Sequence, residues 1–102
     1  MRITAIFEIR VKPGALDAAA ALVESAVEQT RAFGGCESVD VLQARDEPER
    51  LIVIEQWASA AADAAYRRWR AADGAITGLP ALLAAPPQLT VAAPWAKLAR
   101  PS

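Results

Sequence analysis

The run of residues 51–57, Leu-Ile-Val-Ile-Glu-Gln-Trp, constrains the fold more than any other part of the sequence. It is the densest stretch of β-branched residues, which predicts a central strand of a β-sheet. Four successive apolar residues predict that both faces of this strand are covered. Glu55, Gln56 and Trp57 then bring polar and aromatic groups to the point where the strand leaves the core. We therefore expect functional side chains at this strand end and on the element that follows it.

Apolar periodicity divides the rest of the chain into further strands and helices. Alternation of apolar and polar residues indicates half-buried strands, and recurrence every three or four residues indicates helices. Pro13-Gly14 and Gly34-Gly35 separate these segments, and Ser59 is the predicted N-cap of the second helix. The expected elements are strands at 3–11, 37–43, 51–57 and 88–92, helices at 15–33 and 60–72, and a short helical turn at 80–83.

This order of elements predicts an α+β fold of the ferredoxin-like βαββαβ type, in which one antiparallel sheet carries helices on one face. A chain of 102 residues fits one domain, which we place at residues 1–93. Residues 94–102 form a tail without periodicity that is either frayed or docked on a partner. Helices cover only one face of such a sheet. If the other face, with part of the set Ile6, Ile52 and Ile54, is apolar too, the simplest cover is the same face of a second copy, so we expect a homodimer.

The composition excludes several classes of function. A net charge of −1 gives no field that would attract nucleic acid or anionic lipid. The single cysteine, Cys36, forms no intramolecular disulfide, and no pair of residues has metal-ligand spacing, which suits a reducing cytoplasm. The sequence has neither a secretion signal nor an apolar run of the roughly 18 residues that span a bilayer. We therefore expect a cytoplasmic protein that contacts neither nucleic acid nor membrane.

The sequence contains no histidine, which removes the usual general base, haem ligand and metal ligand. A histidine-dependent catalytic triad is excluded. Any acid or base in this protein must be a carboxylate, Tyr, Cys, Lys or the solvent.

Several short motifs lie at the boundaries of the expected elements. They are Val11-Lys-Pro-Gly14, Thr30-Arg31, Gly35-Cys36, the Arg-Asp-x-Pro-x-Arg turn of residues 45–50, and Glu55-Gln56-Trp57. In this combination, over about residues 3–92, the chain resembles the antibiotic biosynthesis monooxygenase family of the dimeric α+β barrel superfamily. The resemblance implies a homodimer whose two sheets pack into a barrel, with a pocket in each subunit between sheet and helices. It also implies an oxygenase without cofactor or metal that converts an aromatic or polyketide-like phenol into a quinone.

Tyr66 marks a departure from the family pattern. Many members carry a histidine nine residues after the tryptophan that ends the central strand, and this chain has Tyr66 there. The matching position implies that Tyr66 faces the pocket. The substitution argues against the haem-degrading branch of the family and leaves open which group handles the proton in an oxygenase.

Trp57 and Tyr66 are the predicted catalytic residues. Trp57 would form a wall of an apolar slot and offer an indole N–H, or it is a core residue at the strand end. Tyr66 would donate a hydrogen bond to a developing oxyanion, or it covers the sheet as a helix-face residue.

Trp69, Gln56, Phe7 and Arg70 are the predicted substrate-binding residues. Trp69 lies three residues after Tyr66, so both line one cavity or both belong to the core. The three arginines of this helix fan around it, so at most two reach a ligand and the remainder is solvated. Glu55 and Gln56 alternate about the strand, and an inward Glu55 would be a candidate base.

Three functions remain open at this stage. The first is the cofactor-independent monooxygenase, and the second is a polyketide cyclase or isomerase in which Tyr66 orients an enolate. The third is a non-enzymatic dimer that binds small molecules. A pocket filled by Trp57, Tyr66 and Trp69 packing on one another would favour the third.

Overall fold

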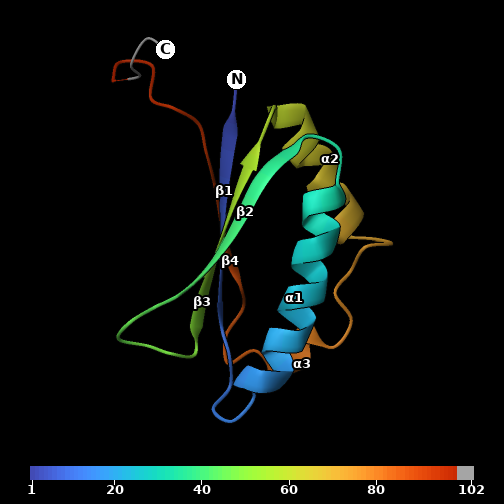
Figure 1. The fold of residues 1–102 in the computed structure, drawn as a ribbon, viewed down its shortest axis with the longest axis vertical. Coiled ribbons are helices and arrows are strands. Elements are labelled where there is room, and N and C mark those ends of the chain that lie inside the picture. Colours follow the sequence, from blue (N-terminus) through green and yellow to red (C-terminus); the bar gives the residue numbers. More distant parts are fainter. Residues whose placement is uncertain (99–102) are drawn as a thin grey trace.

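The computed structural model describes residues 1–98, in which the chain forms four strands and three helices (Figure 1). Each expected element is present, with its ends shifted by at most two residues. The elements in chain order are β1 (Ile3–Arg10), α1 (Leu16–Ala32), β2 (Cys36–Gln43), β3 (Arg50–Trp57), α2 (Ala60–Arg70), α3 (Leu79–Leu82) and β4 (Gln88–Ala92).

The strands form one sheet in the order β2-β3-β1-β4, and all neighbours are antiparallel. β1 and β3 occupy the centre, paired from Ile3 opposite Trp57 to Arg10 opposite Arg50. The helices lie together on one side of the sheet (Figure 1). This is the predicted ferredoxin-like α+β arrangement, and it leaves the second face of the sheet without a helix.

Strand β3 shows how the alternation of side chains divides these two faces. Leu51, Val53, Glu55 and Trp57 are buried beneath the helices, whereas Ile52, Ile54 and Gln56 point to the other face and are half-buried. The prediction that both faces of β3 are covered is therefore wrong for the single chain. The reason is topological, because both crossover helices return on the same side of the sheet.

Local interactions fix the start of α2, the helix that carries most of the candidate residues. The Ser59 hydroxyl accepts a hydrogen bond of 3.1 Å from the Ala62 backbone N–H, which confirms Ser59 as the N-cap. Gly35 has a φ of +92°, and a Cβ there would overlap with Ala62. The turn between α1 and β2 can therefore approach α2 closely.

The buried apolar side chains between sheet and helices form three clusters. Ile3, Ala5, Trp57 and Tyr66 form the core near the start of α2. Ile9, Val11, Ala19, Leu51 and Leu79 form the core near the start of α1. Val27, Val39 and Val53 form the third cluster, between α1 and the strands β2 and β3. The pocket described below is bordered by members of all three clusters.

The described part of the C-terminal tail runs away from the sheet (Figure 1). Trp95 is 66% exposed and Leu98 is 72% exposed, so neither packs on its own chain. Of the predicted tail at 94–102, residues 99–102 lie outside the described residues. Among the helices of residues 1–98, none has both the length and the apolar character needed to cross a bilayer.

Candidate functional site

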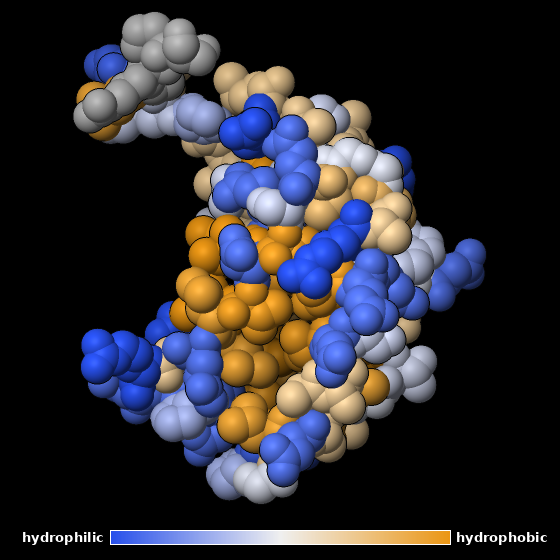
Figure 2. All heavy atoms as spheres, viewed as in Figure 1, coloured by the Kyte–Doolittle hydropathy of each residue, from blue (hydrophilic) through white to orange (hydrophobic). Residues whose placement is uncertain are grey.

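Two hollows border α1. On the face seen in Figure 2, apolar side chains gather between the sheet and this helix. A groove of about 630 Å³ between α1 and β2 lies there, with Asp17, Glu24, Glu28 and Arg31 among its lining residues. The second hollow is a cavity of about 540 Å³ between the sheet, α1, α2 and the segment that leads through α3. Only this cavity contains the predicted Tyr66, so we describe it as the candidate site.

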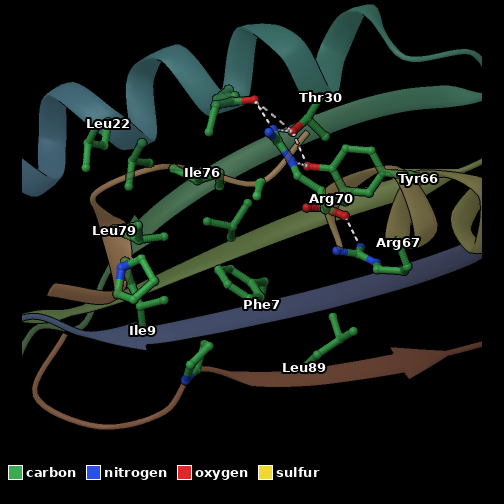
Figure 3. A pocket seen from close by; sticks show the side chains of 18 of the residues that line it. Phe7, Ile9, Leu22, Thr30, Tyr66, Arg67, Arg70, Ile76, Leu79 and Leu89 are labelled. Atoms are coloured by element: carbon green, nitrogen blue, oxygen red, sulfur yellow. Dashed lines mark hydrogen bonds and ion pairs between the residues drawn. The ribbon is translucent and has the colours of Figure 1, made fainter. Parts of the chain in front are cut away.

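Most of the cavity wall is apolar. Phe7 comes from β1, Leu89 from β4, Leu22 from α1, and Ile76 and Leu79 from the segment after α2 (Figure 3). The polar lining residues are Thr30, Glu55, Tyr66, Arg67 and Arg70. Figure 3 shows Thr30, Tyr66, Arg67 and Arg70 gathered at one end of the cavity, which we call the polar end.

Tyr66 is 3% exposed, and its hydroxyl belongs to a chain of hydrogen bonds. The Tyr66 oxygen lies 2.7 Å from Arg70 Nε and 2.7 Å from Thr30 Oγ1. Thr30 donates its single proton to the carbonyl oxygen of Ala26 at 2.9 Å. Tyr66 must therefore donate to Thr30 and accept from Arg70. In this arrangement the phenolic proton points toward α1.

Arg70 holds this arrangement in place with all five of its N–H groups. Their acceptors are the Tyr66 hydroxyl, the Thr30 hydroxyl, the Gln29 side chain, and the carbonyl oxygens of Ala26 and Gly74. Arg70 was predicted to bind substrate directly, and it does line the cavity, but its donors are already used. Its role in the structure is to position Tyr66. No carboxylate of residues 1–98 forms an ion pair with Arg70, so its positive charge remains at the polar end.

Arg67 differs from Arg70 because it is paired with acids. It forms an ion pair with Oε1 of Glu55 and a second one of 3.2 Å with Asp63. Glu55 is 3% exposed, and its Oε1 also accepts a hydrogen bond of 3.1 Å from the Trp57 indole. Removing one member of such a buried pair is costly, because the other charge is left without a partner.

Trp57 and Trp69 lie behind the cavity and do not line it. The ring of Trp57 lies 4.8 Å from that of Tyr66, which lies 6.0 Å from that of Trp69, and Phe33 contacts all three. The three predicted aromatic residues thus pack on one another, as expected for a residual pocket. They do not fill it, however, because the cavity remains open beside them.

Gln56 was predicted to bind substrate but lies on the other face of the sheet. It accepts a hydrogen bond of 2.7 Å from the Thr4 hydroxyl there. Strand alternation explains the correction, because an inward Glu55 requires an outward Gln56. Of the predicted residues, Phe7, Tyr66 and Arg70 line the cavity, whereas Trp57, Trp69 and Gln56 do not.

Sequence reasoning missed two polar residues of the site, Thr30 and Arg67. A signal for Arg67 was present, since Asp63 and Arg67 stand four residues apart on one helix face. Thr30 carried no such signal, because it reaches Tyr66 from a different helix.

Cys36 is half-buried next to this site but does not line the cavity. Burial, followed by the nearby negative charge of Glu55, raises the pKa of the Cys36 thiol above its ordinary value of 9.0. The thiol is therefore protonated at neutral pH, as expected for a small packing residue. Within residues 1–98, no three His, Cys, Asp or Glu side chains are grouped so that they could hold a metal ion.

Solved structures share this architecture. Rv0793 from Mycobacterium tuberculosis is 27% identical with a TM-score of 0.81, and the match covers 93% of this chain and 96% of that protein. PA3566 from Pseudomonas aeruginosa is 27% identical with a TM-score of 0.75, over 92% of this chain and 94% of that one. A protein whose structure is named antibiotic biosynthesis monooxygenase shares the fold at 21% identity, with a TM-score of 0.78 and coverage of 91% and 98%. A search of curated proteins found no match.

The sequence model of one protein family matches most of the chain. That family is described as antibiotic biosynthesis monooxygenase, and the match covers residues 2–76, from β1 to the segment after α2. It includes the residues of the polar end. The chain therefore belongs to the antibiotic biosynthesis monooxygenase family, as its motifs indicated.

Proposed function

We propose that this protein is a cofactor-independent monooxygenase that oxidises a polycyclic phenol to a quinone. One observation carries the proposal: an apolar cavity of about 540 Å³ ends at the hydroxyl of a buried tyrosine, which is held by an arginine that forms no ion pair within residues 1–98. Pockets for small organic ligands typically measure about 300–1,000 Å³ and combine apolar walls with a few convergent polar groups. Membership of the family supports the same reaction class.

The reaction needs a carbanion or phenolate that can reduce O₂. An anthrone-type substrate loses two hydrogens from its central carbon and gains one oxygen there, and the second oxygen atom leaves as water. Negative charge accumulates on the substrate oxygen before O₂ reacts. Tyr66 and the charge of Arg70 would stabilise that oxygen, which is the main contribution a protein can make to such a step.

The hydrogen bonds around Tyr66 can rearrange so that its hydroxyl donates to a ligand. The Ala26 carbonyl accepts from Arg70 as well as from Thr30. Thr30 can therefore turn its proton toward Tyr66 without leaving that carbonyl unpaired. Tyr66 would then donate its own proton to a ligand oxygen in the cavity.

Oxygen uptake with purified protein tests the proposal. Anthrone is the substrate, a metal chelator is present, and no cofactor is added. We expect uptake well above the protein-free rate, and a fall of about 100-fold or more for the enzyme-catalysed part in Tyr66→Phe, as for the loss of an oxyanion donor. Arg68→Ala, which changes an exposed side chain of the same helix, should behave like the wild type. Uptake equal to the protein-free rate would contradict the proposal.

A cyclase or isomerase is the second candidate. Its enolate oxygen would use the same donor, Tyr66, and the same positive charge of Arg70. Such an enzyme forms product without consuming oxygen, so the same measurement separates the two. A binding protein is the third candidate. A cavity filled by Trp57, Tyr66 and Trp69 would favour it, but these rings pack on one another and leave the cavity open. That protein would bind anthrone and convert it no faster than buffer does.

We also propose that the protein acts as a homodimer in the cytoplasm, joined through the sheet face that carries Ile6, Ile52 and Ile54. Ile6 pairs with Ile54 across the two central strands, Ile52 lies two residues before Ile54 on the same face, and all three are only half-buried in the single chain. Size-exclusion chromatography with light scattering should give twice the chain mass at micromolar concentration. A monomer would contradict this assembly.

A further inference from the structure

Glu55 is the one carboxylate among the described residues that line the cavity. It extends from β3 toward the helices and is 3% exposed, so its charge is almost completely removed from bulk solvent. The chain has no histidine, and the other titratable side chains of the lining, Tyr66, Arg67 and Arg70, are hydrogen-bond donors. Glu55 is therefore the group at this cavity that is ready to accept a proton.

The two oxygens of Glu55 have different surroundings. Oε1 accepts the hydrogen bonds from both Arg67 and the Trp57 indole. Oε2 accepts no hydrogen bond from the residues that the structure describes. Every fully buried side-chain oxygen or nitrogen in that part of the chain, however, has a hydrogen-bond partner. Oε2 must therefore reach accessible surface, and the surface that Glu55 borders is the cavity. One oxygen anchors the carboxylate, and the other remains available to a ligand.

The charges of the polar end suit a proton transfer from a neutral ligand. Before transfer, Glu55 carries the negative charge beside Arg67. After transfer, the negative charge lies on the ligand, where the Tyr66 hydroxyl and the positive charge of Arg70 can stabilise it. The total charge within the cavity does not change, so the step does not bring a new charge into a region of low dielectric.

From this geometry we propose that Glu55 is the catalytic base and that the substrate is a neutral carbon acid with a ketone or phenol oxygen. Oε2 takes the proton, the electron pair of the broken C–H bond stays on the substrate as an enolate, and the enolate oxygen lies toward Tyr66. This role rests on the proposed function, in which O₂ then accepts the electrons of the enolate. It also assigns the proton-handling step, which the absence of histidine left open.

Solvent exchange without oxygen isolates this step. Anthrone is bound to the wild-type protein in D₂O under anaerobic conditions, at concentrations above a Kd measured by quenching of tryptophan fluorescence. The loss of its methylene protons is followed by NMR. We expect exchange faster than in buffer, and a fall of about 100-fold in the protein-dependent rate in Glu55→Gln, as for the removal of a general base.

Two controls separate a chemical role from a structural one. Glu55→Gln keeps an oxygen for the Trp57 indole and for Arg67, so the variant should keep its affinity for anthrone. Asp63→Asn removes the other negative charge beside Arg67, and Asp63 does not line the cavity. Because Asp63 is buried, the variant should be less stable, which urea denaturation measures. Below its unfolding temperature it should keep the wild-type exchange rate within about twofold, because Glu55 and the lining residues are unchanged.

The outcomes distinguish this proposal from the proposed function. Exchange in Glu55→Gln at the wild-type rate, or an equal fall in Asp63→Asn, would overturn the role of Glu55 even if oxygen uptake were normal. Exchange that depends on Glu55 without oxygen uptake would support the base and overturn the monooxygenase in favour of the isomerase. Failure of the wild-type protein to bind anthrone would overturn both.

Discussion

The two ends of the cavity are built in different ways. At the polar end, hydrogen bonds fix the functional side chains, as with Tyr66, which Arg70 of the same helix and Thr30 of α1 hold from two sides. At the other end, Ile9, Leu22, Leu79 and Leu83 offer only shape and apolar contact. The difference indicates a division of roles. The apolar end should determine how well a ligand binds, and the polar end should determine what happens to it.

The largest expected effect is the loss of Arg70, which connects α1, α2 and the turn at Gly74. Arg70→Ala should lower the free energy of unfolding by about 3 kcal/mol, because several buried acceptors lose a charged donor. Arg70→Lys should recover only part of this, since an ammonium cannot reproduce the planar set of five donors. Urea denaturation measures both, and exposed Arg68→Ala should stay within about 0.5 kcal/mol of the wild type. An equal cost for Arg68 and Arg70 would show that the polar end is not held as described.

Leu79 tests the apolar end. It is buried and lines the cavity, so Leu79→Ala should cost about 2 kcal/mol of stability and raise the KM for anthrone several-fold. The kcat should remain close to that of the wild type, because the groups that hold charge are unchanged. A fall in kcat comparable with that of Tyr66→Phe would break the division between the two ends.

Thr30 tests the orientation of Tyr66. Thr30→Val keeps the shape of the side chain but removes the oxygen that accepts from Tyr66 and Arg70. We expect a loss of about 1.5 kcal/mol of stability and a lower kcat. Thr30→Ser restores the hydroxyl and should recover most of both. If valine and serine gave the same kcat, the hydrogen-bond chain would have no part in the reaction.

The smallest effect is expected for the N-cap of α2, which supplies Tyr66, Arg67 and Arg70. Ser59→Ala removes the acceptor for the Ala62 N–H and should cost about 1 kcal/mol. Ser59→Asp should keep the cap. Neither should change oxygen uptake below the unfolding temperature, because the hydrogen bonds of the polar end stay intact. A change in uptake with Ser59→Ala would mean that the position of α2 is less firmly fixed than its contacts suggest.

Much of the fold follows from local patterns. The β-branched run before Trp57 predicted β3, the two glycines after Phe33 predicted the end of α1, and Ser59 predicted the start of α2. These are preferences of the backbone within a few residues, so the sequence displays them directly. The ferredoxin-like order of elements then limits the sheet to very few arrangements.

The site was predicted less completely. Tyr66 and Phe7 line the cavity, as predicted, whereas Gln56, a predicted substrate-binding residue, lies on the other face of β3. The two tryptophans, for which site and core were both open, lie in the core behind the cavity. An aromatic residue at the end of a strand serves packing and binding equally well, so its type does not reveal which it does. The hydrogen bonds of Arg70 could not be predicted, because the acceptors that engage its donors lie mainly on α1 and beyond α2.

The sequence by itself determined the elements, their order and the exclusion of histidine chemistry, since each depends on residue types and short spacings. Only the tertiary structure decided that Glu55 and Arg67 pair, that Thr30 and Arg70 hold Tyr66, and that a cavity remains among the buried clusters. The hydrogen bonds of the polar end join residues up to 44 positions apart, as between Ala26 and Arg70, and the cavity wall joins Phe7 to Leu89. Such contacts depend on how helices pack on a sheet, and that packing follows from the summed fit of many side chains.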